Sequence, residues 1–404
     1  MASQLGASCN NYLKESGVLN MSKQEKEARL RAALSHKEAD RVPISDFFWA
    51  GFVENASRKW GGNLDLYSKF DLDYIVISPN MDPIIRDFEI IKQQGDDIWI
   101  RTGFGATVLR RADLPMPHFE SFAVREPEEM DDYIIEPADD KRRFYRSGDD
   151  QMNCLGDRLL RNIPCWIDRV DSCYKDIPVF SAICEGFEYL WRCVGTENSL
   201  YWMMLEPELF ERFIGRIGDF LCDLVECQIR EANGKLSGMY IWGDVAYVNG
   251  MMFSPEIWRQ YFKPITRRLI EICHKAGLMV IYHGCGNATK IYEDMIEIGL
   301  DAYNPLEAKA GLNVAELKKD YKGRLAFVGN IDVRELESGD KARIKKEVLG
   351  KLPAAVGGGW VCQSDHSITE HIAPDSYAYV VELIRDYGQY PLDMERIEAA
   401  LKED

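Results

Sequence analysis

A chain of 404 residues, 46% of them hydrophobic, is long enough to bury one large core. Its 49 basic and 66 acidic residues leave a formal net charge of -17, which would repel a nucleic acid backbone. No run reaches the about 18 uninterrupted apolar residues that a membrane span requires, and no basic segment followed by an apolar one marks a signal peptide. We therefore expect neither nucleic acid nor a membrane as a partner.

The cysteines bear on the compartment. They number eleven, an odd count, and form no C-x-x-C pair, which is typical of a protein in the reducing cytoplasm. Residues 1–21 are polar and contain several Ser, Asn and Gly residues, so we expect a flexible N-terminal arm. Residues 22–404 are expected to form a single domain.

Short β-branched or aromatic runs alternate with segments of helical periodicity along the chain, which is typical of a parallel α/β fold. One helix is expected to begin after Ser254 with Pro255 and to run to about residue 274. Eight βα units predict a (β/α)8 TIM barrel. The expected strands cover residues 42–48, 73–78, 178–184, 238–244, 278–284, 301–306, 325–331 and 359–364.

Two stretches exceed a minimal barrel. Residues 85–110 contain two extended runs around Gly95-Asp96-Asp97, which predicts an antiparallel β-hairpin. Residues 127–175 have helical character. We therefore expect an inserted β-hairpin and a helical excursion after the second strand.

Polar residues gather where the predicted strands end, and barrel enzymes carry their chemistry at that end. Asp244 follows the fourth strand and is a candidate general base or a partner that orients His283. Glu185 follows the third strand and is a candidate acid or ligand. A carboxylate that caps the following turn would explain either residue as well.

Further side chains at the strand ends are candidates for substrate contact. Turn formation would also explain Asn330 and Asp332, and ordinary core packing would also explain the aromatic residues. A flat, apolar substrate such as a methoxylated aromatic ring would suit the aromatic group. The candidates are Phe48, Trp49, Trp242, Tyr282, Asn304, Asn330, Asp332 and Asp365.

His283 and Cys285 come at the end of the fifth predicted strand. Side chains two residues apart on a strand point to the same face, so both can converge on one metal ion. Imidazole and thiolate are ligands that zinc prefers. On the eighth strand, Cys362 and His366 share a face by the same rule, with His366 nearer the strand end.

Four segments resemble the uroporphyrinogen decarboxylase superfamily, and more narrowly its methyltransferase-like branch, over residues from about 22 to about 390. The resemblance implies a (β/α)8 barrel. It also implies zinc held by His283, Cys285 and a third ligand from the eighth strand. Alignment on Ile368 places that ligand at His366, with Cys362 as the alternative. The segments are residues 253–256, 283–287, 329–332 and 357–367.

Enzymes of this branch move a methyl group between a corrinoid and a small substrate, such as a thiol or a methoxylated aromatic. The D-x-H-x-x-G signature of a corrinoid-binding domain is absent from this chain, so the resemblance implies a separate corrinoid protein as partner. It also implies a cytoplasmic enzyme and allows a homodimer.

Two alternatives remain. A decarboxylase of a carboxylated substrate such as a porphyrinogen resembles the superfamily as well, but the Arg-rich R-Q-A-G-R segment of true decarboxylases is replaced by residues 46–52, which contain no arginine. The other alternative is a non-catalytic barrel that binds a ligand.

Overall fold

The computed structural model describes residues 21–62, 64–111, 117–149 and 160–403. The predicted N-terminal arm, apart from Met21, lies outside the described residues. The parallel strands form one sheet whose order follows the chain, as successive βα units build it. Its strands are β1 (Ile75–Ile77), β6 (Val179–Cys184), β7 (Leu236–Trp242), β10 (Met279–His283), β11 (Ala302–Asn304), β12 (Ala326–Val328) and β13 (Trp360–Val361).

The segment 41–48 connects the two edges of this curled sheet. Its Ile44 forms a parallel bridge with Cys362, and the amide of Asp73 donates to the carbonyl of Ile44 at 2.8 Å on the other side. The segment therefore takes the place of the first predicted strand. It makes isolated bridges instead of a regular strand, and Pro43 has no N–H to add to a ladder. The protein thus has the predicted α/β fold. Its curled parallel sheet has seven strands where eight were predicted.

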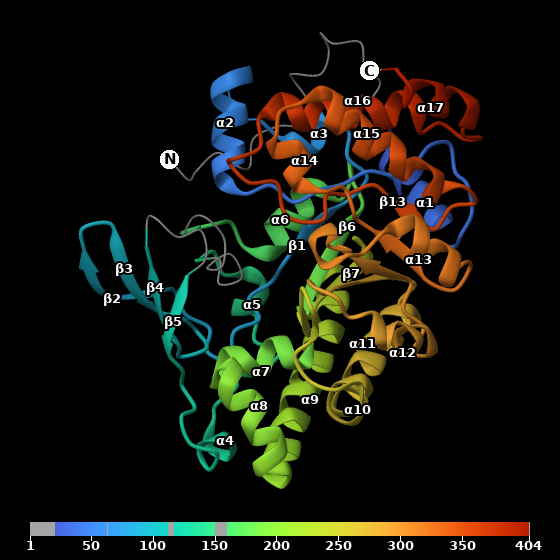
Figure 1. Ribbon diagram of the computed structural model, residues 1–404. Helices are drawn as coiled ribbons and strands as arrows, with labels where there is room; N and C mark the ends of the chain where they lie inside the picture. The colour runs from blue at the N-terminus through green and yellow to red at the C-terminus, as the bar shows by residue number, and fades with distance from the viewer. Residues whose placement is uncertain (1–20, 63, 112–116, 150–159, 404) are drawn as a thin grey trace.

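Helices surround the sheet, most of them on its outer face, while α1 lies across one end (Figure 1). The main ones are α1 (Lys23–Leu34), α2 (Ala50–Trp60), α3 (Leu66–Lys69), α7 (Gly186–Val194), α8 (Thr196–Leu205), α9 (Pro207–Ala232), α10 (Pro255–Ile257), α11 (Lys263–Lys275), α12 (Tyr292–Glu297), α13 (Val314–Asp320), α14 (Val333–Glu337), α15 (Lys341–Lys351), α16 (Pro374–Tyr387) and α17 (Met394–Ala400). Short helical turns are η2 (Trp258–Phe262), η3 (Thr289–Ile291), η4 (Ala308–Ala310) and η5 (Leu352–Ala355).

The helix expected after Ser254 is present but interrupted. The Ser254 hydroxyl accepts from the amide of Ile257 and caps α10, and the last turn of α11 ends at Lys275. Between them η2 is a π-helical turn, because Pro264 lacks the N–H that would continue the α-helical ladder. In the described part of the chain, no helix combines the length and the apolar character needed to traverse a bilayer.

Alternation along the strands separates two cores. The inner core fills the curve of the sheet and is closed at one end by α1, whereas the outer core lies between the strands and the helices. Tyr240 and Ile281 belong to the inner core, and their neighbour Tyr282 belongs to the outer one. The inner core consists of Leu30, Ala33, Leu34, Tyr74, Phe180, Ala182, Tyr240, Met279, Ile281, Ala302, Ala326, Val328 and Val361.

The insertion after β1 is larger than the predicted hairpin. Its four antiparallel strands form a separate small sheet in the order β2-β3-β4-β5, and this sheet stands to one side of the parallel sheet (Figure 1). Phe119 of β5 packs edge-on against Trp191 of α7 at 5.2 Å. The strands are β2 (Glu89–Gln94), β3 (Asp97–Arg101), β4 (Thr107–Arg110) and β5 (His118–Ser121).

The predicted helical excursion over residues 127–175 is mostly irregular where it is described. It contains the short helices α4 (Glu129–Asp132), α5 (Arg142–Tyr145) and α6 (Trp166–Cys173). The buried guanidinium of Arg143 donates to the carbonyls of Asp82, Glu136 and Pro137. These bonds satisfy backbone groups around Arg143 that a helix would have satisfied internally.

Buried ion pairs join α1 to the segment 41–48. Asp73 is fully buried and pairs with Arg29 of α1 and with Arg41, whose Nη1 lies 2.9 Å from Oδ2. The same carboxylate accepts from the amide of Ile44 at 2.7 Å. Asp73 therefore fixes the segment 41–48 against β1 at the end of the sheet opposite the candidate site.

Candidate metal centre

Strand β10 carries the two residues of the H-x-C motif. His283 is its last residue and lies in register between Trp242 of β7 and Asn304 of β11. Gly284 follows at a place where a Cβ would lie 2.3 Å from the hydroxyl of Tyr303, so only glycine fits. The chain then turns, and the amide of Cys285 donates to Oδ1 of Asp244 at 2.8 Å.

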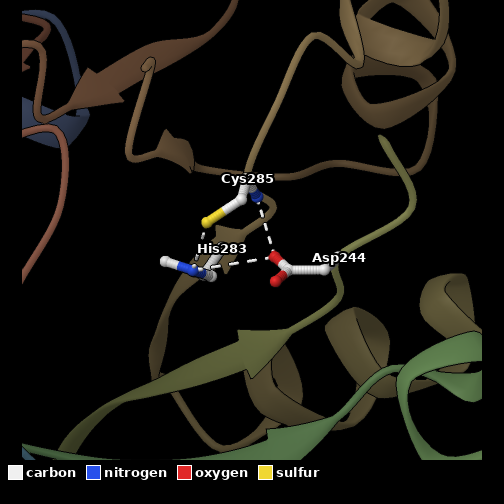
Figure 2. Close-up of side chains that lie close together, drawn as sticks. All are labelled: Asp244, His283 and Cys285. Carbon is white, nitrogen blue, oxygen red and sulfur yellow. Dashed lines mark hydrogen bonds and ion pairs between the residues drawn. The ribbon is translucent and has the colours of Figure 1, made fainter. Parts of the chain in front are cut away.

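Asp244, His283 and Cys285 point toward one another (Figure 2). Their potential ligand atoms all lie within 4.8 Å of one another, and no other group of three His, Cys, Asp or Glu residues does so within the ranges that the structure describes. Nε2 of His283 lies 3.5 Å from Sγ of Cys285 and 3.7 Å from Oδ1 of Asp244. The donor set is therefore one nitrogen, one sulfur and one oxygen.

This spacing fits a tetrahedral metal ion. Zinc binds thiolate sulfur at about 2.3 Å and imidazole nitrogen or carboxylate oxygen at about 2.0–2.1 Å, so two of its ligand atoms lie roughly 3.4–3.6 Å apart. The observed nitrogen–sulfur distance of 3.5 Å lies within this range, and the nitrogen–oxygen distance of 3.7 Å is slightly longer. A small rotation of the Asp244 side chain would thus bring the donors to zinc distances without rearrangement of the strands.

The electrostatic environment favours neutral side chains at this point. Burial lowers the pKa of His283, although Asp244 opposes the shift. Burial, followed by the charges of Asp244 and Glu307, raises the pKa of the Cys285 thiol well above its usual range. A divalent cation would reverse the second effect, because a coordinated thiol is deprotonated.

The predicted eighth-strand ligands are not part of this group. Cys362 is 1% exposed and packs in the outer core, while its neighbour Val361 packs in the inner core. Strand alternation therefore turns Cys362 away from His283. His366 is half-buried, lies edge-on to Trp49 at 5.9 Å, and is near enough to contribute to lowering the pKa of His283. Asp244, predicted as a base or an orienting residue, occupies the third position instead.

Glu185 caps α7, which is the turn interpretation of this residue. One carboxylate oxygen accepts from the amide of Phe187 at 2.6 Å, and the other, Oε1, has no hydrogen-bond partner among the described residues. The side chain is fully buried, and burial raises the pKa of Glu185 to about 8. The group is therefore mainly a neutral acid at pH 7.

We expect Glu185→Gln to make the free energy of unfolding less dependent on pH. In the unfolded chain this carboxyl ionises near pH 4.5, but in the folded chain only near pH 8. The wild-type protein therefore has its full stability with respect to this group below about pH 4.5 and loses stability as the pH rises to about 8. Glutamine stays neutral at every pH. The stability of the variant relative to the wild type should therefore rise between about pH 5 and about pH 8. Urea unfolding of both proteins at both pH values measures this change. If the free energies of unfolding of variant and wild type differed by the same amount at both pH values, the prediction would be contradicted.

Several predicted substrate contacts bind backbone groups instead. The Asn330 amide accepts from the amide of Val314 and donates to the carbonyls of two nearby residues. Asp332 caps α14 and pairs with Arg334 at 2.6 Å. The bond of Asp332 to the amide of Arg334 fits the turn interpretation, whereas Asn330 joins backbone groups that are distant in the sequence.

Asp365 and Tyr282 are also engaged in the fold. The two oxygens of Asp365 accept from the amides of Ala308 and Val333, at 2.8 and 3.0 Å. Tyr282 faces the outer core and donates to the carbonyl of Gly243 at 3.0 Å. Tyr282 therefore lies on the opposite side of the sheet from His283.

The aromatic candidates divide into two groups. Phe48 packs on Phe52 at 5.5 Å and belongs to the outer core. Trp242 lies edge-on to His283 at 4.8 Å, and its indole N–H has no hydrogen-bond partner among the described residues. Trp49 and Trp242 are thus the aromatic candidates beside the two histidines.

Two residues of the site were not predicted. Tyr240 lies two positions before Trp242 on the same face of β7, and its hydroxyl contacts Asn304 beneath His283. Glu307 accepts from the amide of Gly286 at 2.7 Å and pairs with Lys309. Parity along β7 would have identified Tyr240, whereas Glu307 lies in a loop without periodicity.

Comparisons with known proteins agree with this architecture. A family model described as uroporphyrinogen decarboxylase (URO-D) matches residues 165–387. Two curated proteins named uroporphyrinogen decarboxylase, from two strains of Thermus thermophilus, are 32% and 31% identical over 140 residues. The match covers 33% of this chain and only 38% of the length of each relative.

A solved structure, a methyltransferase from Methanosarcina mazei, superposes with a TM-score of 0.60 over 89% of this chain and 98% of that one. The two sequences are 17% identical, so this likeness shows a common fold.

Proposed function

The chain belongs to the uroporphyrinogen decarboxylase family, and from this premise we propose that it is a zinc-dependent methyltransferase. It would move a methyl group between a small substrate, either a thiol or a methoxylated aromatic, and a corrinoid carried on a partner protein. The observation that carries the proposal is the convergence of Asp244, His283 and Cys285. The shared fold with a methyltransferase also supports it.

In this proposal the seven strands and the segment 41–48 form a (β/α)8 barrel, and the metal lies at its mouth, where barrel enzymes perform their chemistry. Three protein ligands leave a fourth position open, as in catalytic zinc sites. Zinc held by the three residues would act as a Lewis acid that lowers the pKa of a thiol or hydroxyl coordinated at the fourth position.

The protein's own side chains would hold and enclose the substrate. His283 would present Nε2 to the metal, and Asp244 keeps the Cys285 loop in place through the amide of that cysteine. Trp242 offers an apolar edge and an unpaired indole donor beside the imidazole.

Decarboxylation of a carboxylated substrate is the second candidate, because the curated relatives bear that name. Such a substrate requires cationic partners. Basic residues near the strand ends are instead paired with acids: Lys309 with Glu307 at 3.0 Å, and Arg334 with Asp332 at 2.6 Å. The pairing of these cations favours methyl transfer.

The experiment compares Asp244→Ala with His366→Ala in anaerobically purified protein. We expect about one zinc ion per chain in the wild type, loss of zinc in Asp244→Ala, and retention in His366→Ala. Mass spectrometry measures the metal. Loss of zinc only in His366→Ala would show that the third ligand comes from the eighth strand.

Activity distinguishes the two candidate functions. The wild type, supplied with a methoxylated aromatic and a reduced corrinoid, should methylate cobalt, which its absorption spectrum reports. Release of carbon dioxide from a porphyrinogen by a zinc-free protein would overturn the proposal in favour of decarboxylation.

A further inference from the structure

Asn304 was expected to contact the substrate, but it lies beneath His283 and is fully buried. Its Oδ1 lies 2.6 Å from Nδ1 of His283 and 2.5 Å from the hydroxyl of Tyr240. Its Nδ2 donates to the carbonyl of Val328 on β12 at 3.0 Å. All polar atoms of this amide therefore bind protein groups.

The orientation of the amide follows from these bonds. A carbonyl oxygen only accepts, so the atom of Asn304 that contacts the Val328 carbonyl must be the NH₂ group. The other atom, which faces His283 and Tyr240, is then the oxygen. This assignment does not depend on resolving nitrogen from oxygen, because the partners decide it.

The same reasoning sets the position of the proton on His283. The Asn304 oxygen cannot donate, so Nδ1 of His283 must carry the proton in their 2.6 Å contact. In a neutral imidazole, Nε2 then has the free lone pair. This lone pair faces the group formed by Asp244 and Cys285, where Sγ lies 3.5 Å away.

We propose that Asn304 is a positioning residue that holds His283 as the Nδ1–H tautomer and so presents the Nε2 lone pair to the metal. Tyr240 assists, because its hydroxyl donates to the same oxygen and limits rotation of the Asn304 side chain. The inference rests on the proposed metal site, but its first test needs no metal.

Backbone contacts place Asn304 where this role requires it. The amide of Gly284 donates to the carbonyl of Asn304 at 2.8 Å, which ties the residue after His283 to β11. His283 and Asn304 are also direct register partners across β10 and β11. Metal-binding histidines commonly donate their second ring N–H to such an acceptor, which fixes the ring and its tautomer.

Two substitutions separate the acceptor from the rest of the side chain. Asn304→Leu has a similar shape but removes both the acceptor for His283 and the donor to Val328. Asn304→Asp retains an oxygen for His283 and removes the amide donor to Val328. Both variants thus lose the hydrogen bond to the carbonyl of Val328, but only the leucine variant loses the acceptor for His283.

The first measurement is a long-range proton–nitrogen correlation spectrum of metal-free protein labelled with ¹⁵N at histidine, in which His283→Gln identifies the signals. We expect the Nδ1–H tautomer in the wild type and in Asn304→Asp, and the Nε2–H tautomer or a mixture in Asn304→Leu. The Nε2–H tautomer in the wild type, or no change in the leucine variant, would overturn the inference.

Zinc affinity, measured by competition with a chelator, is the second measurement. Asn304→Leu should bind zinc about 10- to 100-fold more weakly than the wild type, and Asn304→Asp should recover most of that loss. Circular dichroism checks that both variants fold. If the wild type bound no zinc but kept the Nδ1–H tautomer, the proposed function would fail while the positioning role would stand. If it bound zinc and the leucine variant bound it equally well, only the positioning role would fail.

Discussion

Replacement of Cys285 by Ala is expected to weaken zinc binding by more than about 100-fold and to abolish the proposed methyl transfer. This loss exceeds the one typical for removal of a residue that only hydrogen-bonds a metal ligand. The thiolate is the softest of the three donors and lies 3.5 Å from Nε2 of His283. Its removal leaves one imidazole and one carboxylate, a pair that binds zinc weakly at neutral pH.

The matched control is Cys362→Ala, because Cys362 was the alternative ligand on the eighth strand. This cysteine packs among helix-facing side chains, so its loss should lower stability by about 1 kcal/mol and leave zinc affinity unchanged. Metal content and chelator competition measure the affinity, and thermal unfolding measures the stability. Zinc retained in Cys285→Ala but lost in Cys362→Ala would show that the site has been assigned to the wrong residues.

Replacement of Asp73 by Ala is expected to lower the free energy of unfolding by about 3–5 kcal/mol. The side chains of Asp73 and Arg29 are fully buried, and that of Arg41 is 6% exposed. Removal of the shared carboxylate leaves Arg41 without its buried counterion and leaves Arg29 with only Asp40, whose side chain is 50% exposed. The amide of Ile44 also loses its acceptor.

Urea unfolding at constant pH measures this effect. The control is Asp219→Asn, which removes a surface pair with Arg268 whose side chains are 69% and 48% exposed, and should change stability by less than about 1 kcal/mol. If Asp73→Ala does not fold, Asp73→Asn retains an acceptor for Ile44 and should still lose more stability than the control. Equal effects of the Asp73 and Asp219 substitutions would contradict the structural role of the buried pairs.

The strands were predictable because their apolar runs are local patterns. Seven of the eight predicted ranges overlap strands of the parallel sheet, and the first overlaps the bridging segment 41–48. The insertion was underestimated: one Gly-containing turn was recognised, but β4 and β5 pair across a longer connection. The described part of residues 127–175 has only short helices, and bonds of Arg143 to backbone carbonyls replace helical bonds around it.

In the candidate site, too, local patterns predicted some features and missed others. The two-residue spacing of His283 and Cys285 was sufficient to predict that they converge, although Cys285 lies past the end of β10. On the eighth strand the same parity rule put Cys362 and His366 on one face. That strand, β13, ends at Val361, so alternation does not extend to His366.

The sequence by itself determined the class of fold and the convergence of His283 and Cys285, because both follow from patterns within a few residues. Only the tertiary structure placed Asp244 beside these two residues, turned Cys362 toward the helices, and brought Oδ1 of Asn304 to Nδ1 of His283. The physical reason is that these features depend on which strands are neighbours and on how the chain turns after each strand ends. Asp244 and Cys285 meet through a side chain and a backbone amide 41 residues apart, and no local periodicity encodes such a contact.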